Sequence, residues 1–143
     1  MIERILLPTD GSEAAESAVE RAYELADKFD AELHTMYVIE IEALPTFANL
    51  DTEPVREAHK RRGDELLTEI EENAPAGVNV TKAIEEGHPE SHIVDYAEEH
   101  DIDVITMGTH GREGLGRVLI GSVTERVMRE SPCSVLVTPV EET

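Results

Sequence analysis

The chain has few aromatic side chains and almost no cysteine. Aromatic residues make up 3% of its 143 residues, tryptophan is absent, and Cys133 is the only cysteine. A single cysteine can form neither an intramolecular disulfide nor a cysteine-based metal cluster. Because Cys133 stands between Pro132 and an apolar segment, we expect a buried, unreactive thiol.

Long hydrophobic runs are also missing. No apolar run approaches the roughly 20 residues that a membrane-spanning helix needs. The first residues, 1–7, pass directly into a strand-like sequence and do not show the pattern of a signal peptide. We therefore expect a cytoplasmic protein with no membrane partner, organised as a single domain over residues 1–143.

Basic residues are scarce. Lysine and arginine total 12 against 32 aspartates and glutamates, which gives a formal net charge of −20. Such a surface repels nucleic acid and anionic membranes. It also repels itself in dilute buffer, whereas a Debye length of about 3 Å at 1 M salt would screen most of that repulsion. The composition suggests a halophile's protein, with an ordinary acidic protein as the alternative.

Two kinds of apolar pattern alternate along the chain. Strands are expected at 2–7, 31–39, 78–84, 102–107 and 134–140, and helices after Ser12, over 53–73, from Pro89, and over 122–130. This alternation predicts an α/β fold, a single doubly wound, five-stranded parallel sheet with helices on both faces. Such sheets bind ligands beyond the carboxyl ends of their strands, where the strand order reverses. We adopt the order 3-2-1-4-5, in which the ends of strands one, two and four converge.

A glycine-rich segment between the fourth strand and the last helix is the most informative motif. It reads Gly108-Thr-His-Gly111, then nine residues, then Gly121-Ser122. Glycines let a backbone approach an anion, and the N–H groups at a helix start face it. The P-loop is excluded because residues 111–118 lack its lysine and its serine or threonine. Residues 114–119 lack the third glycine of the dinucleotide fingerprint.

The pattern Gly-x2-Gly-x9-Gly-Ser resembles that of the universal stress protein family closely. Residues 5–12, 107–127 and 131–137 are each typical of that family, and the resemblance extends over essentially the whole chain. It implies an adenine nucleotide alpha hydrolase-like fold and membership of the ATP-binding branch. It also implies a homodimer that pairs through the last strand, Val135–Val140.

The resemblance also implies a nucleotide site. In it, Gly108, Gly111, Gly121 and Ser122 hold phosphates and ribose, and Met107 flanks the nucleotide. The implied site residues are Pro8, Thr9, Asp10, Val38, Met107, Gly108, His110, Gly111, Gly121, Ser122, Val123 and Thr124. Asp10 and its neighbours line the base and ribose side, and Val38 contacts adenine through its backbone. The implied ligand is ATP, alone or with Mg²⁺ or Mn²⁺.

Several of these residues also have structural interpretations. Ser122-Val-Thr-Glu125 fits a capping box, which contributes about 1 kcal/mol to a helix and can coexist with phosphate binding. Asp10-Gly11 fits a simple turn. Gly111 and Gly114 fit an irregular loop that needs positive φ.

Charged and histidine side chains in and near the glycine-rich loop leave the chemistry open. His110 could donate to a phosphate or face solvent, and Arg112 and Arg117 could reach a γ-phosphate or be solvated. His88 and His92 have i, i+4 spacing, but His88 precedes a helix-initiating proline, so we assign no metal site.

Three functions remain after these tests. The first is a dimeric, ATP-binding stress-response sensor or regulator. The second is a weak ATPase or nucleotidyl-transfer enzyme, and the third is a module that binds AMP or another adenylate. Because the chain has no P-loop lysine and no evident general base, we assign no catalytic residue and expect at most slow hydrolysis.

Overall fold

The structure, a computed structural model, describes residues 1–40, 52–110 and 120–140. Its strands are β1 (Arg4–Pro8), β2 (Glu32–Glu40), β3 (Val80–Gly87), β4 (Val104–Gly108) and β5 (Ser134–Thr138). Its helices are α1 (Glu13–Phe29), α2 (Glu53–Glu72), α3 (Pro89–Glu99) and α4 (Ser122–Glu130). Each element follows the sequence prediction, with ends that differ by a few residues.

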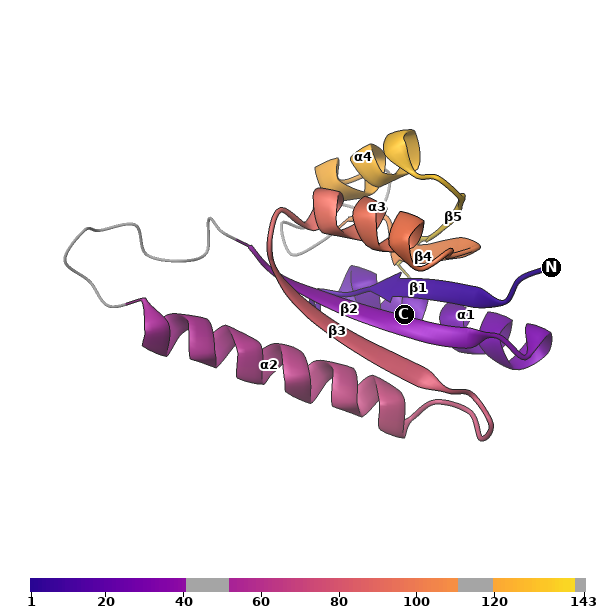
Figure 1. The fold of residues 1–143 in the computed structure, drawn as a ribbon, viewed down its shortest axis with the longest axis horizontal. Coiled ribbons are helices and arrows are strands. Elements are labelled where there is room, and N and C mark those ends of the chain that lie inside the picture. The colour runs from indigo at the N-terminus through magenta and orange to yellow at the C-terminus, as the bar shows by residue number, and fades with distance from the viewer. Residues whose placement is uncertain (41–51, 111–119, 141–143) are drawn as a thin grey trace.

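The five strands form one parallel sheet in the order β3-β2-β1-β4-β5. Helices α1 and α2 cover one face, and α3 and α4 cover the other (Figure 1). The predicted doubly wound fold and strand order are therefore confirmed. In this order β1 lies between β2 and β4, so the carboxyl ends of these three strands meet at one edge of the sheet.

The core consists of two apolar layers that share the central strands. Along β1, Ile5 and Leu7 pack under α1 and α2, whereas Leu6 packs under α3 and α4. All three side chains are fully buried. Burial of both faces explains why this strand reads as a continuous apolar run and not as an alternating one.

Helix α1 begins as predicted and approaches the sheet closely. The Ser12 hydroxyl accepts a hydrogen bond from the Ala15 N–H at 3.2 Å, which caps the helix. The buried side of α1 consists largely of alanine, and small side chains let its backbone lie near the sheet. The helical spacing of the apolar residues from Ala15 to Phe29 predicts that they all face inward. For Phe29 this is wrong, because it is 41% exposed in the last turn, beside the left-handed C-cap Asp30.

The spacing of Val55, Ala58, Leu66 and Ile70 predicts the buried face of α2, and the structure confirms it except at Ala58: Ile70 is buried, and Val55 and Leu66 pack against the core. Ala58 is exposed, and Leu67 is buried in its place. The buried stripe passes through Gly63, where an added Cβ would lie 2.6 Å from Cδ1 of Tyr37. The aromatic ring of Tyr37 thus takes the space that a side chain would fill, and this contact sets the rotation of the helix.

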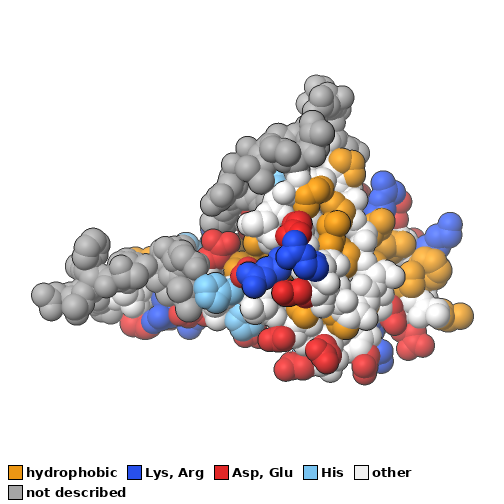
Figure 2. Space-filling view, turned by 90° about the horizontal axis from the view of Figure 1, so that it is seen from above, with side chains coloured by type: hydrophobic (Ala, Val, Ile, Leu, Met, Phe, Trp, Pro, Cys, Tyr) orange, Lys and Arg blue, Asp and Glu red, His pale blue; other side chains and the backbone are white. Residues whose placement is uncertain are grey.

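Ion pairs connect the exposed parts of the helices. Arg56 of α2 donates to both carboxylate oxygens of Glu86 in β3, at 2.9 and 3.0 Å. Arg126 of α4 lies 3.7 Å from Glu90 of α3. In the view onto α3 and α4, acidic side chains gather along one margin, with hydrophobic side chains exposed between the charged ones (Figure 2).

Candidate functional site

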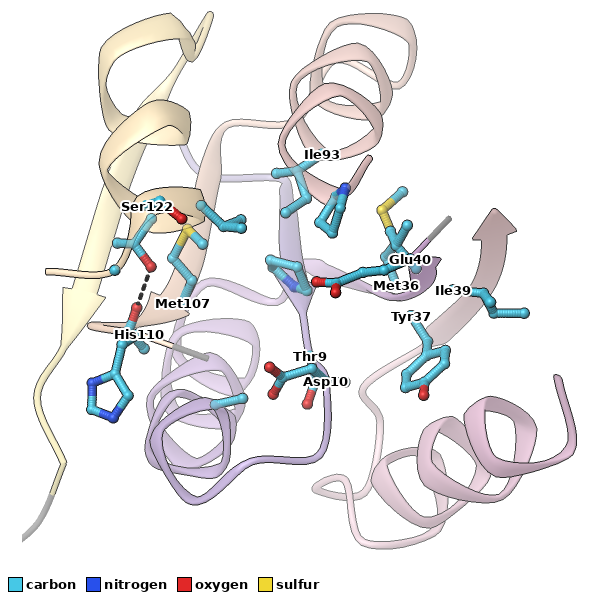
Figure 3. A pocket seen from close by; sticks show the side chains of 18 of the residues that line it. Thr9, Asp10, Met36, Tyr37, Ile39, Glu40, Ile93, Met107, His110 and Ser122 are labelled. Carbon is cyan, nitrogen blue, oxygen red and sulfur yellow. Dashed lines mark hydrogen bonds between the residues drawn. The ribbon is translucent and has the colours of Figure 1, made fainter. Parts of the chain in front are cut away.

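A cavity of about 370 Å³ opens at the carboxyl ends of β1, β2 and β4. Its wall is formed by Pro8, Thr9, Asp10, Ala15, Met36, Tyr37, Val38, Ile39, Glu40, His59, Pro89, Ile93, Met107, Gly108, His110, Gly121, Ser122, Val123 and Thr124. In Figure 3, Ser122 and His110 lie at one side of the cavity, Tyr37 and Ile39 at the other, and Asp10 and Glu40 between them. The strand order predicted a ligand site at this edge.

The cavity brings together eleven of the twelve residues that the sequence singled out, from Pro8 to Thr124. The twelfth, Gly111, lies outside the described residues, as do Arg112, Gly114 and Arg117. The eleven come from three separate segments of the chain, which follow β1, form the end of β2, and run from the end of β4 into α4.

The helix α4 starts one residue earlier than a capping box at Ser122 requires. Its N-cap is Gly121 in an extended conformation, and no side chain caps it. The Gly121 N–H donates to the Thr109 carbonyl at 2.6 Å, which fixes the chain before the helix. The capping-box interpretation of Ser122 is therefore wrong. Ser122 instead occupies the first turn, and the first N–H groups of a helix have no partner within the helix.

Two residues of the cavity wall join β4 to its neighbours. The Thr124 hydroxyl donates to the Gly108 carbonyl at 2.9 Å, which ties α4 to the end of β4. An added Cβ on Gly108 would lie 2.2 Å from the carbonyl oxygen of Ala14 in α1. Both residues thus have a structural role in addition to their place beside the cavity.

The turn after β1 supports the structural interpretation of Asp10 as well as its position in the cavity. The Asp10 carboxylate accepts from the Ser12 N–H at 2.9 Å, and the Thr9 hydroxyl accepts from the Gly11 N–H at 3.2 Å. Gly11 has φ +80, which favours glycine. These bonds hold Asp10 at the cavity and begin α1.

The sequence prediction missed part of the wall. Met36 and Val38 point the same way along β2, so the alternation of a strand could have identified Met36. Pro89 begins a helix directly after β3, at the same edge of the sheet as Asp10. His59 could not be found this way, because it depends on how α2 rotates around Tyr37.

The acidic and imidazole side chains of the wall are those of Asp10, Glu40, His59 and His110. None of the described lining residues is lysine or arginine. An anion in the described part of this cavity would therefore be held chiefly by backbone N–H groups and the dipole of α4.

Cys133 and His92, which the sequence also singled out, do not line this cavity. Cys133 is half-buried, and so is less buried than predicted, and burial raises the pKa of its thiol. His92 hydrogen-bonds the Glu86 carbonyl at 2.9 Å. Residues 1–40, 52–110 and 120–140 contain no group of three potential metal-ligating side chains, and no helix there is long and apolar enough to cross a membrane.

Comparison with known proteins decides the family. The sequence profile of the Universal stress protein family matches residues 1–139. The chain belongs to the universal stress protein family. It is 38% identical over 141 residues to Universal stress protein MJ0531 of Methanocaldococcus jannaschii, a match that covers 96% of this chain and 82% of that protein.

Solved structures give the same fold. The structure of hypothetical protein MJ0577 superposes with a TM-score of 0.76 at 30% identity, covering 100% of this chain and 99% of that one. The fold is therefore adenine nucleotide alpha hydrolase-like. A universal stress protein in complex with cAMP matches at 23% identity (TM-score 0.70; 98% of each chain). An Arabidopsis thaliana family member with AMP bound matches at 18% (TM-score 0.65; 95% of this chain, 90% of that one).

Proposed function

We propose that this universal stress protein binds ATP in the cavity at the carboxyl edge of its sheet and acts as a dimeric, nucleotide-dependent regulator of a stress response. The observation that carries the proposal is the convergence of the α4 N-terminus with Asp10 and the end of β2 on one cavity. A nucleotide requires a site for its phosphates, an acceptor for its ribose hydroxyls, and backbone groups that can pair with its base.

The phosphates belong at the start of α4. There, Gly121 has no side chain, and the N–H groups of the first turn and the helix dipole favour negative charge. The Asp10 carboxylate suits a ribose hydroxyl, since it can accept a hydrogen bond from it. Mg²⁺ or Mn²⁺ would accompany the phosphates and neutralise part of their charge.

The adenine belongs beside Val38. The Met36 carbonyl accepts the last bond from the β1 side, from the Thr9 N–H at 2.9 Å. Backbone groups two residues apart in a strand point to the same side, so those of Val38 point to where β1 has already ended. They can pair with the edge of a base, while Met36, Pro89 and Ile93 supply apolar walls.

Holding ATP suits this wall better than cleaving it. Rapid phosphoryl transfer needs a positioned base and a charge clamp on the γ-phosphate, and the described lining residues include no lysine or arginine. The second candidate is a module for AMP or a related adenylate, favoured by the relatives that carry AMP and cAMP. A weak ATPase is the third.

Isolation of the bound nucleotide tests the proposal. We expect protein purified in molar KCl to release an adenine nucleotide on denaturation, and the emptied protein to bind ATP at micromolar concentration. Titrations with ADP, AMP and adenosine rank the candidates, and a turnover assay with Mg²⁺ or Mn²⁺ measures hydrolysis. Equal affinity for ATP and AMP would favour the adenylate module. Failure of all four ligands to bind would contradict the proposal.

The dimer is proposed through β5, the edge strand of the sheet. Leu136 in the middle of β5 is 38% exposed, and an apolar edge strand is open to pairing with another chain. We expect a homodimer joined through residues 135–140 at micromolar concentration in sedimentation equilibrium, and Leu136→Lys should be monomeric. Phe29→Lys, which alters an equally exposed apolar residue on α1, is the matched control. A monomeric parent protein would contradict the assignment.

The composition supports a proposal about the salt concentration in which this protein works. The net charge of −20 supports a cytoplasm rich in salt, where screening removes most self-repulsion. Binding measurements should therefore be made in KCl at molar concentration.

A further inference from the structure

A cluster of aromatic and titratable side chains joins β2 to α3 near the start of β2, whereas the cavity lies at the carboxyl end of that strand. His34 is 7% exposed, and its Nδ1 lies 2.6 Å from the Tyr96 hydroxyl. The ring of His100 stacks on that of Tyr96, with centroids 3.8 Å apart, and lies 5.9 Å from the ring of His34. Nothing in the nucleotide site uses these groups.

The partners of His34 match its neutral form. The Tyr96 O–H can donate to Nδ1, which leaves the proton of the imidazole on Nε2, 3.4 Å from the Glu32 carboxylate. If Nδ1 gained a proton, it would have to donate to the Tyr96 oxygen. The Tyr96 O–H would then need another acceptor, although Tyr96 is itself only 8% exposed. Protonation therefore works against the contact between β2 and α3.

The charges around His34 act in both directions. Burial lowers the pKa of His34 from its ordinary value of 6.5, while Glu32 on the same strand raises it. His100, the C-cap of α3, and Arg4 of β1 lower the pKa further. On β3, Glu85 is close enough to act on Tyr96, whose pKa is raised chiefly by burial. Burial of the imidazole is the largest effect.

The cluster is continuous with the cavity wall. His34, Met36 and Val38 follow one another on the same face of β2, and Met36 and Val38 line the cavity. Ile93 and Tyr96 lie three residues apart on the buried face of α3, and Ile93 lines the cavity. One layer of side chains between β2 and α3 thus runs from His34 to the proposed adenine site.

We propose that His34 is a proton-sensing group, whose protonation loosens α3 from β2 and thereby weakens nucleotide binding. The inference rests on the proposed nucleotide-binding function. Linkage requires the reverse effect as well, so binding of the nucleotide favours the neutral form of His34. The regulator would then hold its nucleotide at neutral pH and release it as the cytoplasm acidifies.

Protonation of His34 should lower the unfolding free energy as well. The unfolded chain, in which His34 has its ordinary pKa, binds this proton more readily than the folded chain does. The contribution of neutral His34 is present above about pH 6.5 and is lost as the pH falls through the lower pKa of the folded protein. Nucleotide affinity should fall at lower pH than the unfolding free energy does, because bound nucleotide lowers the pKa of His34 further.

The test compares the ATP dissociation constants of four chains at pH 7.5 and pH 5.5. In the parent protein the ratio of the two constants should be about tenfold larger than in His34→Gln, a typical size for coupling between sites. Exposed Glu32→Gln should fold normally and shift the midpoint of the pH profile lower, because the imidazolium loses its counter-charge. His92→Gln is the matched control and should keep the parent profile, because His92 lies on α3 like Tyr96 but bonds the Glu86 carbonyl instead of His34.

The comparison also removes the direct effect of the cavity. Any direct effect of pH on the residues of the cavity wall is common to all four chains. Nuclear magnetic resonance titration of the His34 ring gives an independent readout. ATP binding with parallel profiles in the parent and His34→Gln chains would overturn the inference alone. Absence of ATP binding at pH 7.5 in the parent would overturn the proposed function and the inference together.

Discussion

A Gly121→Glu chain should bind ATP at least about 100-fold more weakly than the parent protein, and should bind adenosine nearly unchanged. Gly121 is the N-cap of α4 and lines the cavity at the helix start. A carboxylate there would stand about 4 Å from the phosphates and repel each negative charge by about 4 kcal/mol at an effective dielectric constant near 20. Since about 1.4 kcal/mol corresponds to a factor of ten, even partial screening leaves a large loss.

A series at this position separates charge from shape. An added Cβ on Gly121 would lie 3.0 Å from Cα of His110, which is tight, and the backbone at φ −68 accepts any residue. Gly121→Ala measures that contact alone, and Gly121→Gln adds the bulk of glutamate without its charge. The difference in ATP affinity between the glutamine and glutamate chains is the electrostatic term, measured by calorimetry in the same KCl buffer. Undiminished ATP affinity in Gly121→Glu would place the phosphates elsewhere.

The sequence predicted the fold because the apolar patterns of strands and helices alternate without ambiguity. It also predicted that most of the singled-out residues would line one cavity, because the ends of β1, β2 and β4 must meet once the strand order is assigned. The capping role of Ser122 failed for a local reason, since the bond from Gly121 to Thr109 starts α4 earlier than side-chain spacing indicates. A capping motif describes side chains only, whereas here a backbone hydrogen bond determines where the helix begins.

Features that depend on how elements pack were beyond the reach of sequence patterns. His59 reaches the cavity because Gly63 lets α2 rotate onto Tyr37. The bond between His34 and Tyr96 joins residues 62 positions apart in the chain. A histidine inside a strand pattern indicates burial, but its partner becomes identifiable only when α3 has a position on the sheet.

A Gly108→Ala chain should lose about 3 kcal/mol or more of unfolding free energy in the absence of any nucleotide. The added Cβ would lie 2.2 Å from the carbonyl oxygen of Ala14 and 2.6 Å from its carbonyl carbon. Both are backbone atoms, so no side chain can swing away, and α1 itself would have to move off the sheet. Overpacking of this kind costs about 1–3 kcal/mol when side chains can adjust, and more when they cannot.

A hydrogen bond to the neighbouring helix opposes such a movement of α1. The Tyr23 hydroxyl in α1 donates to the Ile70 carbonyl of α2 at 2.6 Å. Shifting α1 would strain this bond and open the layer between α1 and β4. The chain must therefore absorb the clash as lost stability, which denaturant unfolding at fixed KCl concentration would measure.

The matched control is Gly77→Ala. A glycine with positive φ is usually the more costly one to replace, but here we expect Gly77 to be the less costly position. Gly77 has φ +92, a conformation that alanine disfavours by about 1–2 kcal/mol, but an added Cβ there meets nothing within 4 Å. Gly108 has no positive φ and nevertheless should be the more costly position, because the cost comes from the neighbouring backbone. Unchanged stability of nucleotide-free Gly108→Ala would contradict the packing role. If the loss occurs, weak ATP binding by that chain says little about phosphate contacts, and the Gly121 series becomes the informative test of this motif.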